Sequence, residues 1–154
     1  ATLCNTQVVY DPQQGSITAV DLVSGQSTLL TDAFPTGDEY TYSAASFRDG
    51  WVLSHSLWDE QDAVTHQFFR APDGTLTELP QQMYCDARGT TPVSILDIQN
   101  GLVFLQYAYD TVSVSSYDYE GNPYTYDTYL PVYGIIPLQE LLAGSQNYRE
   151  LTFD

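Results

Sequence analysis

The chain has 154 residues, the length of one ordinary domain, and 43% of them are hydrophobic, which favours a folded protein over a disordered one. Its formal net charge is −16, with 20 acidic residues, four arginines and no lysine. This balance excludes nucleic acid as a partner, because affinity for phosphates comes from lysine and arginine, and it disfavours anionic membrane surfaces for the same reason.

The chain begins Ala1-Thr-Leu-Cys-Asn, without a methionine, which is typical of a processed product. No run approaches the 18 or so consecutive apolar residues of a transmembrane helix, so we expect no membrane insertion.

Short runs of apolar and β-branched residues, separated by turn clusters, predict strands along the whole chain. They fall into three groups. The first group covers approximately residues 4–31, with strands near 6–10, 16–22 and 27–30. The second covers 41–79, with strands near 41–47, 51–58, 63–70 and 75–79. The third covers 91–152, with strands near 91–98, from 102, ending near 138, and at 147–152.

These groups repeat about every 50 residues. The turn that ends at Gly50 aligns with the turn that ends at Gly101, and an apolar run follows each glycine. A fixed period of this size indicates a repeat architecture, and four-stranded antiparallel groups are typical of β-propeller blades. We therefore expect one all-β domain or fragment over 1–154, with about three four-stranded blades, the first incomplete. A β-sandwich with coincidental repeats is the alternative fold.

Two segments resemble the outer hairpins of bacterial extracytoplasmic, TolB-like β-propellers. They are Phe69-Arg-Ala-Pro-Asp-Gly-Thr-Leu-Thr-Glu-Leu and Ile136-Pro-Leu-Gln-Glu with Tyr148-Arg-Glu-Leu-Thr. The resemblance implies binding and scaffolding in the extracellular space or cell envelope of a bacterium. It carries over no site residue. Because fewer than four blades do not close a ring, we expect another protein chain, or the remaining blades of the same propeller, as partner.

The period breaks once, where about 20 extra residues separate the second and third strands of the last group. Eight of the 13 tyrosines lie in this stretch, between Tyr107 and Tyr133. A four-residue loop at Glu120–Pro123 would make a long hairpin in which Tyr119 pairs with Tyr124 and Tyr117 with Tyr126. Since side chains alternate between faces, these tyrosines would share one face with Tyr107 and Tyr109.

Tyrosine is frequent at interfaces, so this hairpin is a candidate recognition arm. The alternative is that it folds back to cover an exposed edge or face. Trp51 is expected in the core, and Trp58 either packs there or lines a binding face. The candidate binding residues are Tyr107, Tyr109, Tyr117, Tyr119, Tyr124, Tyr126 and Trp58.

No catalytic, metal-binding or cofactor motif is present. His55 and His66 are the only histidines and are expected to face each other across one hairpin. Cys4 and Cys85 allow one disulfide, but the strand assignment places them at opposite ends of the blades, which argues against it. We expect a non-catalytic binding module. The alternative is a propeller-type glycosidase or lyase that uses surface carboxylates, with carbohydrate as its ligand.

Overall fold

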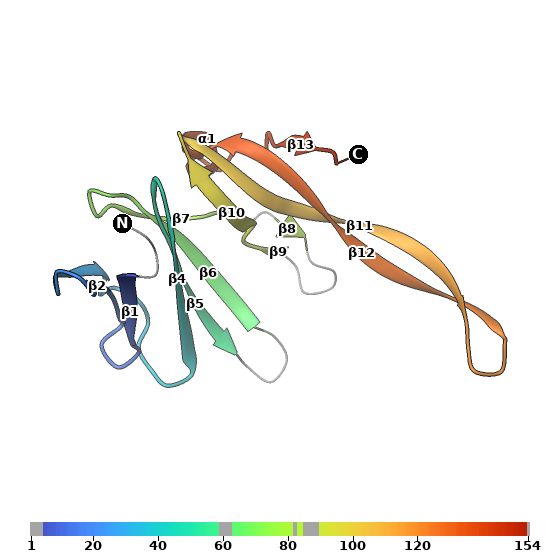
Figure 1. Ribbon diagram of the computed structural model, residues 1–154, viewed down its shortest axis with the longest axis horizontal. Coiled ribbons are helices and arrows are strands. Elements are labelled where there is room, and N and C mark those ends of the chain that lie inside the picture. Colours follow the sequence, from blue (N-terminus) through green and yellow to red (C-terminus); the bar gives the residue numbers. More distant parts are fainter. Residues whose placement is uncertain (1–4, 59–62, 82, 85–89, 154) are drawn as a thin grey trace.

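The computed structural model describes residues 5–58, 63–81, 83–84 and 90–153. The described residues form three antiparallel sheets, of three, four and four strands, and one two-stranded hairpin. Figure 1 shows the three sheets lying next to one another in chain order. The expectation of an all-β fold built from antiparallel sheets is confirmed. Within the described ranges, no helix has the length and apolar character needed to cross a membrane.

The first sheet consists of β1 (Thr6–Asp11), β2 (Ser16–Asp21) and β3 (Ser27–Thr31), in that order. In β2, Ile17 and Ala19 are buried, whereas the residues on either side of them are only half-buried. This period of two is the pattern of a strand that has one face covered by another layer of the protein.

The second sheet consists of β4 (Tyr40–Phe47), β5 (Gly50–Trp58), β6 (Ala63–Arg70) and β7 (Leu76–Glu78). Each strand pairs with its neighbour in the chain, and β4 and β5 are joined by a two-residue turn. The four ranges agree closely with those expected from the sequence.

The third sheet consists of β10 (Ser94–Gln99), β11 (Leu102–Tyr117), β12 (Pro123–Pro137) and β13 (Arg149–Leu151). A short helix, α1 (Leu138–Leu142), lies between β12 and β13 and buries two leucines. Before this sheet, β8 (Met83–Tyr84) and β9 (Thr90–Thr91) form the small hairpin.

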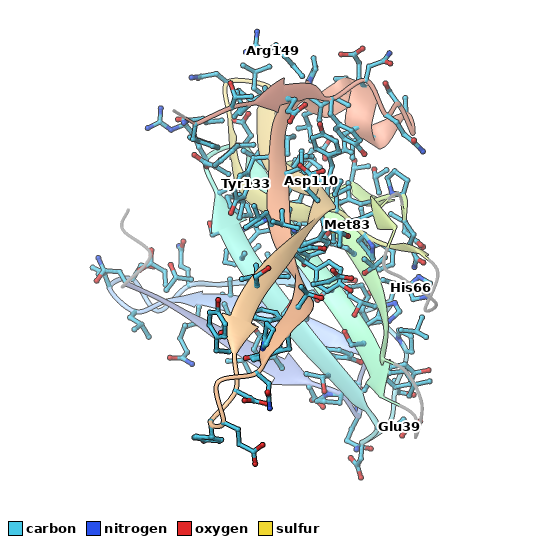
Figure 2. All side chains as sticks on the ribbon, turned by 90° about the vertical axis from the view of Figure 1, so that its right-hand side faces the viewer. Glu39, His66, Met83, Asp110, Tyr133 and Arg149 are labelled. Atoms are coloured by element: carbon cyan, nitrogen blue, oxygen red, sulfur yellow. The ribbon has the colours of Figure 1, made fainter. Side chains whose placement is uncertain are left out.

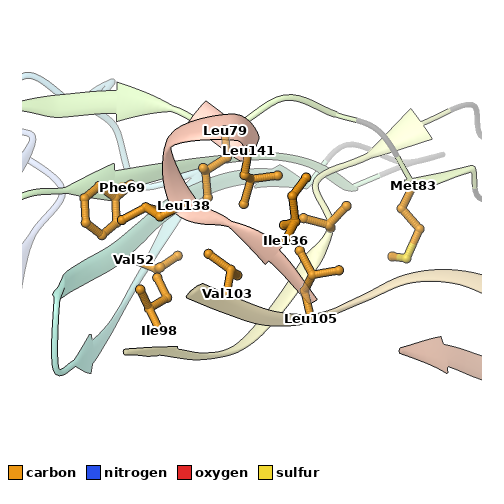
Figure 3. Close-up of a cluster of buried hydrophobic side chains, with 11 residues drawn as sticks. Val52, Phe69, Leu79, Met83, Ile98, Val103, Leu105, Ile136, Leu138 and Leu141 are labelled. Carbon is orange, nitrogen blue, oxygen red and sulfur yellow. The ribbon is translucent and has the colours of Figure 1, made fainter. Parts of the chain in front are cut away.

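Two clusters of buried apolar side chains hold the sheets together. The first lies between the first and second sheets and contains Ile17, Ala19, Leu30, Phe34, Tyr42 and Leu53. The second lies between the second and third sheets (Figure 3) and contains Val52, Phe69, Leu79, Met83, Val93, Ile98, Val103, Leu105, Ile136, Leu138 and Leu141. Full burial of one Leu or Ile side chain is worth about 1.5–3 kcal/mol, so these clusters are the main source of stability.

Polar contacts also link neighbouring sheets. The Asp49 carboxylate, in the turn between β4 and β5, accepts a hydrogen bond of 2.8 Å from the Gly101 amide in the turn between β10 and β11. The Arg70 guanidinium of the second sheet donates to the Leu29 carbonyl oxygen of the first at 3.4 Å. The opening strands of the second and third sheets, β4 and β10, also lie against each other.

The sequence alignment of Gly50 with Gly101 is wrong by one residue. Phe47 pairs with Gly50 across the first turn, whereas Gln99 pairs with Leu102 across the second. Gly50 is therefore the first residue of its strand, and its structural counterpart is Leu102, because Gly101 lies inside the turn. A slip of one residue moves every following side chain to the opposite face of a strand.

Two expectations from the sequence include residues that lie outside the described ranges. Cys4 and Cys85 lie outside the described residues, so the disulfide expectation is untested. The first group of strands, expected to be an incomplete blade over approximately 4–31, forms a three-stranded sheet among the described residues.

Candidate interaction surface

The candidate surface is the outer part of the hairpin formed by β11 and β12. β10 pairs with β11 as far as Gln106, and β13 pairs with β12 from Tyr133 onward. Beyond these points, residues 108–132 pair only with each other, and we call this segment the arm. Its strands have about ten residues each, so the arm is roughly 30 Å long at about 3.3 Å per residue. Figure 1 shows it projecting away from the three sheets.

The expected pairing of the tyrosines in the arm is wrong by three positions. Tyr117 lies opposite Pro123, and the loop begins at Asp118, two residues earlier than expected. A shift by an odd number of residues exchanges the faces of one strand relative to the other. As a result Tyr117 lies on the opposite face from Tyr124 and Tyr126, whereas the sequence predicted one shared face.

Aromatic side chains therefore occupy both faces of the arm. On one face Tyr109 packs edge-on against Tyr129, with ring centroids 6.4 Å apart. On the other face the rings of Tyr124 and Tyr126 lie 6.0 Å apart. By the register of the strands, the first face carries Tyr109, Tyr117 and Tyr129, and the second carries Val112, Val114, Tyr124 and Tyr126.

The loop at the end of the arm is closed by the side chain of Asp118. Its Oδ1 atom accepts hydrogen bonds from the backbone amides of Glu120 and Asn122, each at 2.9 Å. These bonds, chiefly the one from Asn122, hold the pKa of the Asp118 carboxyl below its usual range. Gly121 has a φ of 84°, which a glycine adopts without strain. The closed loop presents Tyr119 to solvent.

Tyr107 lies at the base of the arm and is packed rather than presented. It is the extra residue of a β-bulge between Gln106 and Ala108. Its ring covers Gly134, where a Cβ atom would come within 2.8 Å of it, and stacks on the Tyr148 ring at 4.5 Å. Burial is the main cause that raises the pKa of the Tyr107 hydroxyl. The tyrosines of the arm itself are all at least 46% exposed.

The arm does not fold back onto the sheets. Tyr117 is 72% exposed and Tyr119 is fully exposed, and the remaining tyrosines of the arm are about half exposed. In Figure 2 the arm extends in front of the sheets, and Asp110 and Tyr133 mark the region where it leaves them. A shallow hollow of about 370 Å³ at its end is lined by Tyr117, Asp118, Tyr119 and Tyr124.

The arm carries only negative charge. It contains Asp110, Asp118, Glu120 and Asp127, and no Lys, Arg or His. The Ser113 hydroxyl donates to the Asp127 carboxylate across the two strands at 3.0 Å. The surface therefore combines exposed aromatic rings with carboxylates, an arrangement that suits cationic or amphipathic groups.

The two tryptophans belong to β5. Trp51 is half-buried and packs against the cluster between the first and second sheets, which agrees with the expected core role. Trp58 pairs with Ala63 through its backbone, but its side chain lies outside the described residues, so its proposed place on a binding face is untested.

His55 and His66 face each other, as expected. They are directly opposite in the β5–β6 pair, and their rings stack with centroids 5.1 Å apart. His55 also packs against Phe34 at 4.8 Å, and its burial, followed by the nearby His66, lowers its pKa. His66 Nδ1 lies 3.1 Å from a Glu78 carboxylate oxygen. This geometry is that of a packed histidine.

The described residues contain no group of three or more His, Cys, Asp or Glu side chains that could hold a metal ion. The pKa values of the Asp73 and Asp118 carboxyls are lowered, in each case mainly by a backbone hydrogen bond. A general acid needs the opposite shift.

Comparison with known proteins gives no relative for this chain: no family model, no curated protein and no solved structure matches it.

Proposed function

We propose that the protein is a non-catalytic binding module, built from β-propeller-type blades, that uses its arm to recognise another protein. The exposed aromatic surface of the arm carries this proposal. A two-stranded ribbon is only marginally stable alone, and here it presents large apolar rings to water on both faces. Such surface is costly unless a partner covers it, and contiguous exposed apolar surface is typical of interaction sites.

The blade assignment is supported by how the sheets follow one another. Each is an antiparallel sheet whose strands are neighbours in the order of the chain, and each packs face to face on the next. The opening strands β4 and β10 lie together, as innermost strands do in a propeller. This arrangement and the TolB-like outer hairpins favour an extracytoplasmic bacterial propeller, completed by further blades or by a partner chain.

The composition of the arm indicates the chemistry of its partner. Tyrosine rings attract Arg and Lys side chains through their negative faces, and nearby carboxylates strengthen that attraction. The arm offers both and has no basic residue of its own. We therefore propose a protein surface rich in Arg or Lys as the partner. Glycan hydrolysis is less favoured, because the Asp118 carboxyl at the end of the arm has a lowered pKa, whereas a general acid needs a raised one.

Shortening the arm tests this function. Residues 111–129 are replaced by Asn-Gly, which joins Asp110 to Leu130, a directly opposed pair, through a tight turn. The probe is a labelled oligoarginine peptide, with oligoglutamate as its control, and binding is followed by fluorescence anisotropy. We expect the shortened protein to keep its thermal midpoint and to lose at least tenfold in affinity for oligoarginine.

A second variant separates recognition by tyrosine from attraction by net charge. Serine replaces Tyr117, Tyr119, Tyr124 and Tyr126 together, which leaves every carboxylate of the arm in place. We expect most of the affinity for oligoarginine to disappear in this variant. Unchanged binding would show simple charge attraction and contradict the proposal, as would unfolding of the shortened protein. Release of reducing sugar from a glycan would contradict the non-catalytic assignment.

A further inference from the structure

The outer face of the third sheet is largely apolar, and no other described part of the chain covers it. Phe104 packs against Tyr133 at 5.8 Å, and Tyr133 meets Phe153 edge-on at 5.8 Å. Two adjoining hollows, of about 260 and 240 Å³, share Leu102 and Ile135 in their walls. Leu102 is 45% and Phe153 71% exposed. We call this surface the tail face, and its main residues are Leu102, Phe104, Tyr133, Ile135, Arg149 and Phe153.

The corresponding face of each earlier sheet is covered by the sheet that follows it. Phe104 and Ile135 are paired across β11 and β12, and the register makes Val52 and Phe69 their counterparts in the second sheet. Val52 and Phe69 are both buried against the third sheet.

In the first sheet the same two positions are Val8 and Ala19, which are paired across β1 and β2. They pack against the second sheet. In the third sheet, only half-buried residues remain at these positions, with no further sheet over them among the described residues. Of the three sheets, only the third therefore has this face uncovered by the described part of the chain.

The first sheet also has a face that no other described residue covers, on the side away from the second sheet. Val9, Val20 and Leu29 point away from the core, and Val9 and Leu29 are about half exposed. We call this surface the head face. Val9 is the counterpart of Leu53, a fully buried residue through which the second sheet packs on the sheet before it.

We propose that the tail face of one copy of this chain binds the head face of a second copy. The contact repeats, between two molecules, the sheet-on-sheet packing that occurs twice within one chain. Because the two faces differ, the contact is head-to-tail, and repeated copies form a closed ring or a filament. The contact uses no residue of the arm and is independent of the recognition proposed for the arm.

Charge makes this association depend on salt. Each copy carries a net charge of −16, so two copies repel each other at long range. At about 0.15 M ionic strength the screening length is about 8 Å, against about 30 Å at 0.01 M. We expect added sodium chloride to strengthen the association, since an apolar contact persists while the repulsion is screened.

The test measures molar mass by light scattering across protein concentration and salt. The full chain is expected to form oligomers. Leu102→Asp on the tail face and Val9→Asp on the head face are each expected to weaken association at least tenfold. If Leu102→Asp loses the β-sheet signal of the folded protein in circular dichroism, Phe153→Asp, at a more exposed position, takes its place. Tyr117→Asp, on the arm, adds the same charge and is expected to leave association unchanged.

Mixing the two single variants identifies the geometry. Val9→Asp keeps an intact tail face and Leu102→Asp an intact head face, so an equimolar mixture is expected to form dimers and nothing larger. A strict monomer at all concentrations and salt levels would overturn the proposal. So would oligomers that survive Val9→Asp, because they would show a tail-to-tail contact. The protein with the shortened arm is expected to associate like the full chain, which separates this proposal from the recognition function.

Discussion

Gly50 and Gly101 provide the sharpest test of the strand register. The sequence repeat treats them as the same position, whereas the structure gives them different surroundings. At Gly50 the φ angle is 155°, and a Cβ atom would lie 2.6 Å from the Arg70 carbonyl oxygen and 2.8 Å from the Phe69 ring. At Gly101 the φ angle is 75°, and a Cβ atom would meet nothing within 4 Å. We therefore compare Gly50→Asn with Gly101→Asn.

The expected costs follow from these surroundings. A residue forced into a sparsely populated backbone conformation costs about 1–3 kcal/mol, and overpacking adds about 1–3 kcal/mol, so Gly50→Asn should lose about 2–6 kcal/mol. Asparagine tolerates the left-handed conformation at Gly101, so that variant should lose about 1 kcal/mol or less. A domain of this size loses about 2–4 °C in thermal midpoint per kcal/mol.

Urea denaturation and thermal melting, both followed by circular dichroism, measure the two variants. Both variants are measured at the same low protein concentration, so that self-association does not affect the comparison. We expect the midpoint of Gly50→Asn to fall by at least about 4 °C, and by clearly more than that of Gly101→Asn. Equal losses in the two variants would refute the register and restore the alignment of the two glycines.

Two further predictions concern the core and the histidine pair. Leu105→Ala removes a fully buried side chain of the third sheet, so urea denaturation should show a loss of about 2.7–5 kcal/mol; a loss below about 1 kcal/mol would contradict its core position. The pKa of His55 is lowered in the folded protein, so the unfolded chain binds the additional proton as pH falls below about 6.5. The stability of the folded protein should therefore decrease below that pH. In thermal melts, the midpoint of His55→Phe should fall less between pH 7.5 and 5.5 than the midpoint of the unmodified protein. An equal fall in the two proteins would show that His55 does not contribute.

The positions of the strands could be predicted because turns mark their ends. Glycine and aspartate at the ends of the apolar runs accept the backbone angles of tight turns, and their spacing located all strands of the second and third sheets within a few residues. The pairing of His55 with His66 followed from the same turns. When strong turn signals lie close together, few choices remain for the residues that form the strand between them.

The faces of the strands could not be predicted, because a face changes with a single residue. Nothing in the sequence distinguishes the glycine that begins a strand at Gly50 from the glycine inside the turn at Gly101. In the arm, the Asp118 side chain closes the loop early, and Pro123, which has no backbone N–H, begins the returning strand. The bulge at Tyr107 adds a further shift that depends on packing over Gly134.

The sequence predicted where the long hairpin lies in the chain, but not which of its tyrosines share a face. The excess length and the tyrosines identified the arm, because both are visible as a break in the repeat. The sequence placed six tyrosines on one face, whereas the structure divides them between two faces, a loop and the base of the arm. The tail face was missed, although its residue Phe104 is apolar like Val52, its buried counterpart in the second sheet.

The absence of basic residues from the arm also determines which proteases can cleave it. Trypsin cleaves after Lys and Arg, and the sequence has neither between Arg88 and Arg149. Trypsin therefore leaves β10, β11 and β12 in one fragment, even if the arm opens. Chymotrypsin, which cleaves after aromatic residues, meets an exposed tyrosine on both strands and in the loop. The two enzymes thus report separately on whether the arm of a given sample is free or covered.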